Sequence, residues 1–369
     1  MNANLKKFKV TKCVGIGSYS DVFEVIACDN AGANESYALK RFNLRNSKAA
    51  DCALREHRIL KRLSMENSQS PFLTALFFSI FSHGFPMLFL TYASGFDLQD
   101  VLDSWHYLRV PEVVFYCSEV ICGLEHLHSL SIVHLDIKPR NILLAKSGHV
   151  IITDFDCAFE LTLCCGSPKE EDFRGTELFK APEIKYRRSI SIKADIWSLG
   201  QTMWLMTVGK IRRYITDRKS DAVTYRWIKE DDKHVPRVLE PFFIACLAFD
   251  ESERATLEEI KRLEIFSGLN WDAAALLRRK PPFQPSKLRH NTGITDCIED
   301  SFTQDDFYIT VNAQPVQWKS FTSELQLPPE CKCPTDKIYE IGSNFNFINS
   351  SVILKTEGES KVEEACPTA

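Results

Sequence analysis

Apolar and polar positions alternate in the first quarter of the chain, which predicts β-strands there. Residues 8–27 alternate around a pair of glycines and predict a hairpin, and residues 37–40 predict a short strand. Apolar residues at helical spacing then predict a helix from about Lys48. The most apolar stretch, residues 72–93, is broken by glycine and proline. It therefore predicts two buried strands joined by a turn, and no membrane span.

The pattern becomes helical after this stretch. Pro111 is suited to the first turn of a helix, and the residues that follow it form one apolar face: Val113, Cys117, Val120, Ile121, Leu124 and Leu127. Two short strands, a loop over residues 160–176 and a helix over about 191–208 come next. This order predicts an α+β, bilobal fold with a small β-rich N-lobe and a larger, mainly helical C-lobe.

Composition restricts the class of protein. Of the 369 residues, 44% are hydrophobic and 25% are charged, which is ordinary for a globular protein. The net charge of −4 gives no reason to expect nucleic acid or an anionic membrane as a partner. The first residues lack the apolar core of a signal peptide, and the 13 scattered cysteines are typical of reduced thiols. We therefore expect an intracellular, cytoplasmic protein, with the nucleus as the second compartment to consider.

The residues with the clearest chemistry lie in two short runs. Residues 134–141 place an aspartate, a lysine and an asparagine at offsets of two, four and seven from a histidine, and Asp154 follows thirteen residues later. Phosphate transfer needs a carboxylate that accepts a hydroxyl proton, a cation for the phosphate and oxygen ligands for magnesium. The pattern therefore indicates Asp136 and Lys138 as catalytic residues, and Asn141 as a metal ligand together with Asp154.

The glycine pair lies in a segment whose backbone N–H groups are able to approach phosphate oxygens closely. Taken alone, a G-x-G spacing fits a plain hairpin turn equally well. Followed by Ala38 and Lys40 on the next strand, the segment resembles a glycine-rich loop that covers nucleotide phosphates. Its residues are Gly15, Ile16, Gly17, Ser18, Tyr19, Ser20 and Val22.

Together these motifs resemble the eukaryotic protein kinase family over about residues 8–266. The resemblance implies ATP and Mg²⁺ as cofactors, with Lys40 paired to Glu56 and holding the α- and β-phosphates. It also implies a hinge between the lobes at residues 91–93 and a ribose contact from Asp97. Besides the loop, it assigns these residues to ATP binding: Ala38, Lys40, Glu56, Thr91, Ala93, Asp97 and Leu143.

Residues 173–183 resemble the end of a kinase activation segment, with a Gly-Thr pair and an Ala-Pro-Glu run. By that resemblance Thr176 braces the catalytic residues. Glu183 pairs with Arg254, and Asp195 anchors the catalytic loop. These three roles are structural.

Residues 148–155, 264–271 and 281–285 are similar to the AGC group of serine/threonine kinases, and the C-terminal tail is closest to its ribosomal-protein kinase branch. In that group an aromatic tail motif fills a pocket beside the helix of the ion-pair glutamate. Trp318 and Phe321 are the matching rings, with a chance aromatic pair as the alternative, and the same pocket would admit a regulatory partner. The expected division is an N-lobe (8–92), a C-lobe (93–266), an AGC-like tail (267–322) and a polar, disordered extension (323–369).

Several positions depart from the family pattern. Leu135 replaces an arginine that grips a phosphate on the activation segment, and the usual phosphorylated threonine falls on Asp172. We therefore expect activity that is not controlled by phosphorylation of that segment. Arg140 stands where AGC kinases carry a glutamate, which predicts weakened selection for arginine upstream of the acceptor. Ser20 and Asp156 each replace a family glycine, beside the phosphates and beside the metal respectively.

Two functions fit this sequence. The first is a serine/threonine protein kinase that transfers the γ-phosphate of ATP to hydroxyls of a protein substrate. The second is a pseudokinase scaffold that binds partners with little or no phosphate transfer, a reading that rests on the departures at Ser20, Leu135 and Asp156. The first is favoured because the residues that touch phosphate or metal are all present: Lys40, Glu56, Asp136, Lys138, Asn141 and Asp154.

Overall fold

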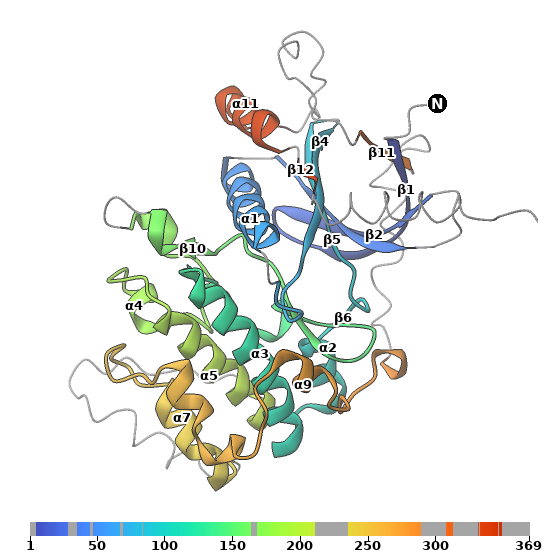
Figure 1. Cartoon of the computed structure of the whole chain (residues 1–369). Helices are drawn as coiled ribbons and strands as arrows, with labels where there is room; N and C mark the ends of the chain where they lie inside the picture. The colour runs from blue at the N-terminus through green and yellow to red at the C-terminus, as the bar shows by residue number, and fades with distance from the viewer. Residues whose placement is uncertain are drawn as a thin grey trace, which may run out of the picture. The chain divides into compact units, whose positions relative to one another are not determined.

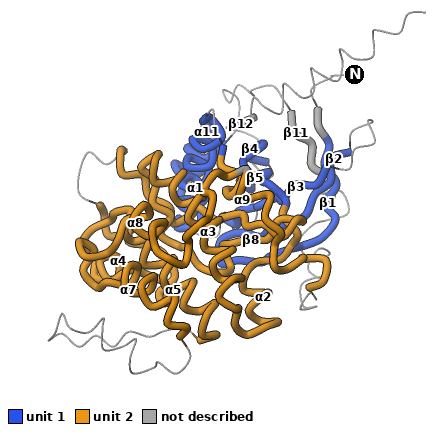
Figure 2. The backbone as a smooth tube through the Cα atoms, turned by 60° about the horizontal axis from the view of Figure 1, so that its bottom comes forward, with its two compact units in different colours: residues 1–69, 74–92, 290–369 blue, residues 70–73, 93–289 orange. Residues whose placement is uncertain are grey.

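The computed structural model describes residues 5–28, 35–44, 47–66, 69–82, 84–163, 168–210, 235–288, 308–312, 331, 333–345 and 347–348. The chain divides into two compact units, shown in different colours in Figure 2. Unit 1 comprises residues 1–69, 74–92 and 290–369, and unit 2 comprises residues 70–73 and 93–289. Within the described ranges, no helix combines the length and the apolar character that crossing a bilayer requires.

Among the described residues, unit 1 is built on a seven-stranded antiparallel sheet in the order β11-β1-β2-β3-β5-β4-β12. Both predicted hairpins form, since β1 pairs with β2 and β4 pairs with β5. The strands are β1 (Leu5–Ile16), β2 (Ser20–Ala27), β3 (Ser36–Phe42), β4 (Leu76–Ser82), β5 (Phe85–Thr91), β11 (Tyr308–Asn312) and β12 (Phe347–Ile348).

The core of unit 1 follows from the alternation in the sequence. Along β2, Phe23 and Val25 are fully buried and their neighbours are half-buried, because successive side chains point to opposite faces of a sheet. The ring of Phe8 lies 4.7 Å from that of Phe89, centroid to centroid. Each such side chain contributes roughly 1.5–3 kcal/mol on burial, so this cluster is the main stabilising element of the sheet.

Helix α1 (Ser47–Met65) contacts β4 and begins one residue before its predicted start. A second helix, α11 (Thr335–Asn344), contacts α1, and β12 pairs with β4 (Figure 1). These two elements correct the expectation that residues 323–369 form a disordered extension. Helix α11 is stabilised by packing on α1 and strand β12 by pairing with β4, which local composition does not show.

Unit 2 is mainly helical, as predicted. Its helices are α2 (Leu98–Trp105), α3 (Val110–Ser129), α4 (Pro182–Lys185), α5 (Lys193–Val208), α7 (Glu240–Cys246), α8 (Leu257–Lys261) and α9 (Ala273–Leu277). Its short strands are β6 (Phe96–Asp97), β7 (Ile132–Val133), β8 (Ile142–Leu144), β9 (Val150–Ile152) and β10 (Phe159–Glu160). They form two small sheets, β6-β8-β9 and β7-β10.

Helices α3 and α5 pack against each other at the centre of unit 2 (Figure 1). Pro111 lies in the first turn of α3, as predicted, and nearly every residue of α5 is buried. Helix α5 begins at Lys193, two residues after its predicted start. The loop predicted after β10 contains a short 3₁₀ turn at Glu170–Asp172. The packing of α3 against α5 fixes the backbone that carries the catalytic loop, residues 134–141, between β7 and β8.

Candidate active site

The turn between β1 and β2 is made by the glycine pair. The N–H of Gly17 donates to the carbonyl of Ser20 at 2.8 Å, and a Cβ on Gly17 would lie 2.9 Å from that oxygen. A side chain at Gly17 would therefore force the turn to shift. The tip residue Ile16 is 60% exposed. The predicted loop is thus a tight turn, and its glycines leave the backbone N–H groups uncovered by side chains. Such a turn suits contact with phosphate.

Lys40 and Glu56 form the predicted ion pair in unit 1. The Nζ atom of Lys40 lies 2.6 Å from a carboxylate oxygen of Glu56. Lys40 comes from β3, where it pairs with Val22 of β2, and Glu56 comes from the middle of α1. Both side chains are buried, Glu56 completely. Because a buried charge is stable only with a partner, the placement of α1 controls the placement of the Lys40 ammonium.

Asp136 is the centre of the catalytic loop in unit 2. Its Oδ1 accepts the N–H of Thr176 at 2.7 Å. Its Oδ2 accepts from the Nζ of Lys138 at 2.7 Å and from the Nδ2 of Asn141 at 3.0 Å. Lys138 also donates to the hydroxyl of Thr176 at 2.7 Å. The predicted bracing by Thr176 is confirmed, and both oxygens of Asp136 are held in fixed positions.

Asp195 of α5 anchors this loop, as predicted. Its two carboxylate oxygens accept the N–H groups of His134 and Leu135, each at 2.8 Å, and His128 Nε2 lies 2.9 Å from one of them. His134 in turn contacts the carbonyl of Thr153 at 3.0 Å through Nε2, and its ring packs on a buried phenylalanine, Phe155. His134 and Phe155 therefore hold the loop in place through packing and a hydrogen bond.

The two predicted metal ligands lie at adjacent backbone positions. Asn141 immediately precedes β8 and Asp154 follows β9, and the N–H of Thr153 donates to the carbonyl of Asn141 at 3.0 Å. Asp136 accepts from the amide nitrogen of Asn141, so the amide oxygen is the atom that is left for a ligand. The described residues contain no cluster of three or more His, Cys, Asp or Glu able to hold a metal. One amide oxygen and one carboxylate suit Mg²⁺, which takes its other ligands from water and phosphate.

The remaining predicted nucleotide contacts divide between the units. In unit 1, Ala38 pairs with Leu90, and Thr91 ends β5 with its N–H donating to the carbonyl of Ala75 at 3.0 Å. In unit 2, Ala93 is buried, and Asp97 of β6 pairs with Leu143 of β8. Asp97 and Leu143 thus place a carboxylate beside an aliphatic side chain, a combination that fits a ribose next to a base.

Asp97 also caps α2, where its carboxylate accepts the N–H of Asp100 at 3.0 Å and its own N–H donates to the Asp100 carboxylate. Burial and the neighbouring Asp100 charge raise the pKa of Asp97 to about 7. Because this folded-state pKa lies above the unfolded value, the charged form destabilises the fold. This cost is absent at low pH and grows as the pH rises from about 4 to about 7.

We expect Asp97→Asn to raise the melting temperature at pH 8 by about 4 °C and to leave it unchanged near pH 4. Asparagine keeps an oxygen for the cap and carries no charge. Melting temperatures of both proteins across pH 4–8 check this. A constant difference across that range would contradict the assignment of the pKa shift.

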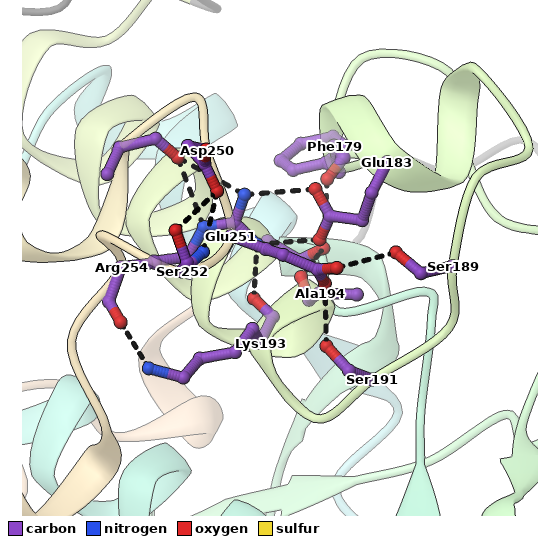
Figure 3. Close-up of polar contacts among 12 residues, drawn as sticks. Phe179, Glu183, Ser189, Ser191, Lys193, Ala194, Asp250, Glu251, Ser252 and Arg254 are labelled. Carbon is purple, nitrogen blue, oxygen red and sulfur yellow. Dashed lines mark hydrogen bonds and ion pairs between the residues drawn. The ribbon is translucent and has the colours of Figure 1, made fainter.

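The activation segment is fixed by a buried ion pair (Figure 3). The guanidinium of Arg254 donates to both carboxylate oxygens of Glu183, at 2.7 and 3.0 Å, as predicted. Arg254 also donates to the carbonyls of Ala248 and Lys193, and it is 1% exposed. A bidentate pair with additional acceptors is the geometry in which a buried charge is best compensated. Glu183, at the start of α4, is thereby tied to the segment before α8.

The departures from the family pattern have clear positions. Leu135 is buried, so its side chain packs inside the unit. Its backbone has a φ of 65°, and its carbonyl oxygen approaches Gly175 so closely that a Cβ there would lie 2.3 Å from it. Asp172 is half-buried at the end of the 3₁₀ turn, where its carboxylate accepts the N–H of Lys169. Arg140 is exposed close enough to Asp97 for its charge to act on the pKa of that group.

The sequence interpretation missed residues in the C-terminal part of the chain that contact α1. Phe345 stacks on His57, the residue next to Glu56. A signal was present, because Pro334 precedes apolar residues at helical spacing, Ile338, Ile341 and Phe345. The aromatic pair predicted for this role, Trp318 and Phe321, lies outside the described residues.

Comparisons with known proteins agree with this geometry. Residues 8–266 match the model of the protein kinase domain. The chain is 31% identical over 296 residues to ribosomal protein S6 kinase alpha-3 of Homo sapiens, covering 78% of this chain and 39% of the relative. It is 31% identical over 375 residues to a putative ribosomal protein S6 kinase alpha-1 of Caenorhabditis elegans, covering all of this chain and 44% of the relative. The chain thus spans about two fifths of the length of these relatives.

Proposed function

Because the chain belongs to the protein kinase family, we propose that it is a serine/threonine protein kinase, which transfers the γ-phosphate of ATP to a protein hydroxyl. The observation that carries the proposal is the arrangement about Asp136. The ammonium of Lys138 and the amide nitrogen of Asn141 lie 2.7 and 3.0 Å from the same carboxylate oxygen of Asp136. The similarity to ribosomal protein S6 kinases supports serine and threonine as the acceptors.

Each group has a role in this proposal. Asp136 orients the acceptor hydroxyl and takes its proton, and Lys138 neutralises charge on the phosphate that is transferred. Lys40, with the turn at Gly15 and Gly17, holds the remaining phosphates. Asn141 and Asp154 hold Mg²⁺, which when bound neutralises charge on phosphate oxygens.

Control by phosphorylation of the activation segment is not part of this proposal. Leu135 offers no donor for a phosphate, and Asp172 already places a carboxylate at the end of the 3₁₀ turn. The alternative of a pseudokinase scaffold rests on Ser20, Leu135 and Asp156. None of these displaces Asp136 from its hydrogen bonds, so phosphate transfer is the function that the geometry supports best.

The test is transfer of labelled phosphate from ATP by the purified chain, after treatment with a phosphatase and its removal. We expect Mg²⁺-dependent labelling of serine and threonine in a protein mixture, unchanged by the phosphatase. Analysis of the labelled amino acids identifies the acceptor. Labelling that is equal with and without Mg²⁺ would count against a kinase. Activity that disappears after phosphatase treatment and returns with a phosphate on residues 168–176 would count against independence from phosphorylation.

A further inference from the structure

A cluster of polar side chains lies at the base of the glycine turn, residues 15–20, which joins β1 to β2. The guanidinium of Arg41 in β3 donates to a carboxylate oxygen of Asp21 in β2 at 3.3 Å. The side-chain amide of Asn43, just after β3, donates to the same oxygen at 2.9 Å. Asp21 and Arg41 are each only 8% exposed, so their ion pair is largely shielded from water. A buried carboxylate with two donors on one oxygen is held in a defined position.

Aromatic side chains fix the guanidinium of Arg41 as well. Its central carbon lies 4.9 Å from the centroid of the Phe85 ring and 5.2 Å from that of the Phe23 ring. Phe23 is fully buried in the core of the sheet. The attraction between a cation and an aromatic ring is strongest where water is excluded. Arg41 is therefore held by the core of unit 1 and in turn holds Asp21.

Asp21 connects these contacts to the glycine turn. In the register of the sheet, Asp21 pairs with Ile16 of β1 on one side and with Arg41 of β3 on the other. A second connection is in the backbone, where the N–H of Asn43 donates to the carbonyl of Tyr19 at 2.8 Å. The segment from Tyr19 to Asp21 is thus fastened to the end of β3 by side chains and by the main chain.

Strand β3 carries the lysine of the ion pair on its other face. Lys40 precedes Arg41, and successive side chains of a strand point to opposite faces of the sheet. The register partner of Lys40 is Val22, the residue after Asp21. Strand β3 therefore presents the proposed phosphate contact on one face and the fastening of the glycine turn on the other.

We propose that Asp21, Arg41 and Asn43 form a clamp that holds the glycine turn where its backbone N–H groups contact nucleotide phosphates. This inference rests on the proposed kinase function. Gly15 and Gly17 make the turn easy to deform, and a deformable loop loses conformational entropy when it orders on a ligand. The clamp reduces that cost because it orders the turn before the nucleotide binds. Its three members are positioning residues, since they act through the backbone of the turn.

The test compares Arg41→Met with Arg41→Lys in the whole chain. Methionine keeps the aliphatic bulk beside the rings but removes the cation that faces Asp21, whereas lysine keeps a positive charge. We expect Arg41→Met to raise both KM for ATP and the Kd of Mg²⁺-ATP about tenfold, with kcat nearly unchanged, and Arg41→Lys to recover part of this loss. Lys9→Met, at an exposed lysine of β1 in the same sheet, is the matched control and should change none of these constants.

A milder variant acts on the other member of the ion pair. Asp21→Asn keeps an oxygen that accepts from Asn43 and should raise KM for ATP about threefold. Combining it with Arg41→Met removes both charges. This double variant should lose less affinity for ATP than the two single changes added together, because residues of one network act as a unit.

Hydrogen exchange distinguishes a clamp from a general contribution to stability. In Arg41→Met, the amides of residues 15–22 should exchange faster, while those of β4 and β5 keep their protection. Faster exchange throughout the sheet together with an unchanged KM for ATP would show that the ion pair only stabilises unit 1. That result would overturn the proposal.

These readouts keep the clamp separate from the proposed function. If the unaltered chain transfers phosphate and Arg41→Met binds Mg²⁺-ATP equally tightly, the clamp is wrong and the kinase stands. If the unaltered chain binds Mg²⁺-ATP and transfers no phosphate, the kinase is wrong, and weaker binding by Arg41→Met still supports the clamp. An unaltered chain that binds no nucleotide would overturn both.

Discussion

Replacement of Asp136 by asparagine is expected to lower the rate of phosphate transfer by about three orders of magnitude. The affinity for Mg²⁺-ATP should stay within a few-fold of its original value. The loss has two causes. Asparagine cannot accept the hydroxyl proton, and its amide nitrogen would face two donors, the Lys138 ammonium and the Asn141 amide, in place of an acceptor. Lys138 would therefore move away from its position at Thr176 as well.

Single-turnover rates at saturating ATP measure this effect, and the shift in melting temperature with Mg²⁺-ATP measures affinity. Asp103→Asn, at an exposed acid on α2 of the same unit, is the matched control and should be fully active. A decrease of less than tenfold for Asp136→Asn would mean that another group takes the proton. A decrease accompanied by loss of ATP binding would assign Asp136 to the metal rather than to the acceptor.

Replacement of Arg254 by alanine is expected to destabilise unit 2 by about 3–5 kcal/mol, because Glu183 would keep a buried charge without its partner. For a chain of this size that corresponds to a decrease of roughly 10 °C in melting temperature. Removing both charges, in a Glu183→Met, Arg254→Met variant, should cost less than removing Arg254 alone. Arg254→Lys should fall between, since lysine cannot donate to two carboxylate oxygens in one plane.

Thermal and urea unfolding of the four proteins measure these differences. The order of stability among the variants is the informative result, because an exposed ion pair would give small and nearly equal losses of stability in all of them. A double variant that is less stable than either single replacement would show that the attraction between Glu183 and Arg254 exceeds the cost of burying the two charges.

The fold of unit 2 and most of its site could be predicted because their signals are local. Two of the three hydrogen bonds to the Asp136 carboxylate come from Lys138 and Asn141, within the run of residues 134–141. Thr176 and Asp195, far along the chain, were predicted only through the family resemblance. Periodicity in the sequence located α3 and α5 to within two residues of their starts. Such elements bury a continuous apolar face, and that face is visible in the sequence.

The C-terminal part of unit 1 could not be predicted in the same way. Helix α11 has ten residues, and a helix of that length is marginal without tertiary contacts. Its apolar positions lie within a polar, charged stretch, so composition favours disorder although their spacing is helical. The pKa of Asp97 was equally hidden, since it depends mainly on the burial of the carboxylate in the folded chain.

The order of strands in the sheet of unit 1 has a consequence for biosynthesis. Strands β1 and β4 leave the ribosome long before β11 and β12, the strands that pair with their outer edges. At about 5–20 residues per second, the nascent sheet carries two unpaired edges for roughly 15–60 s. During that interval α1 also lacks its contacts with α11. Chaperone capture, or truncation before residue 331, should therefore affect β1 and β4 first, although the missing residues lie far from these strands in the sequence.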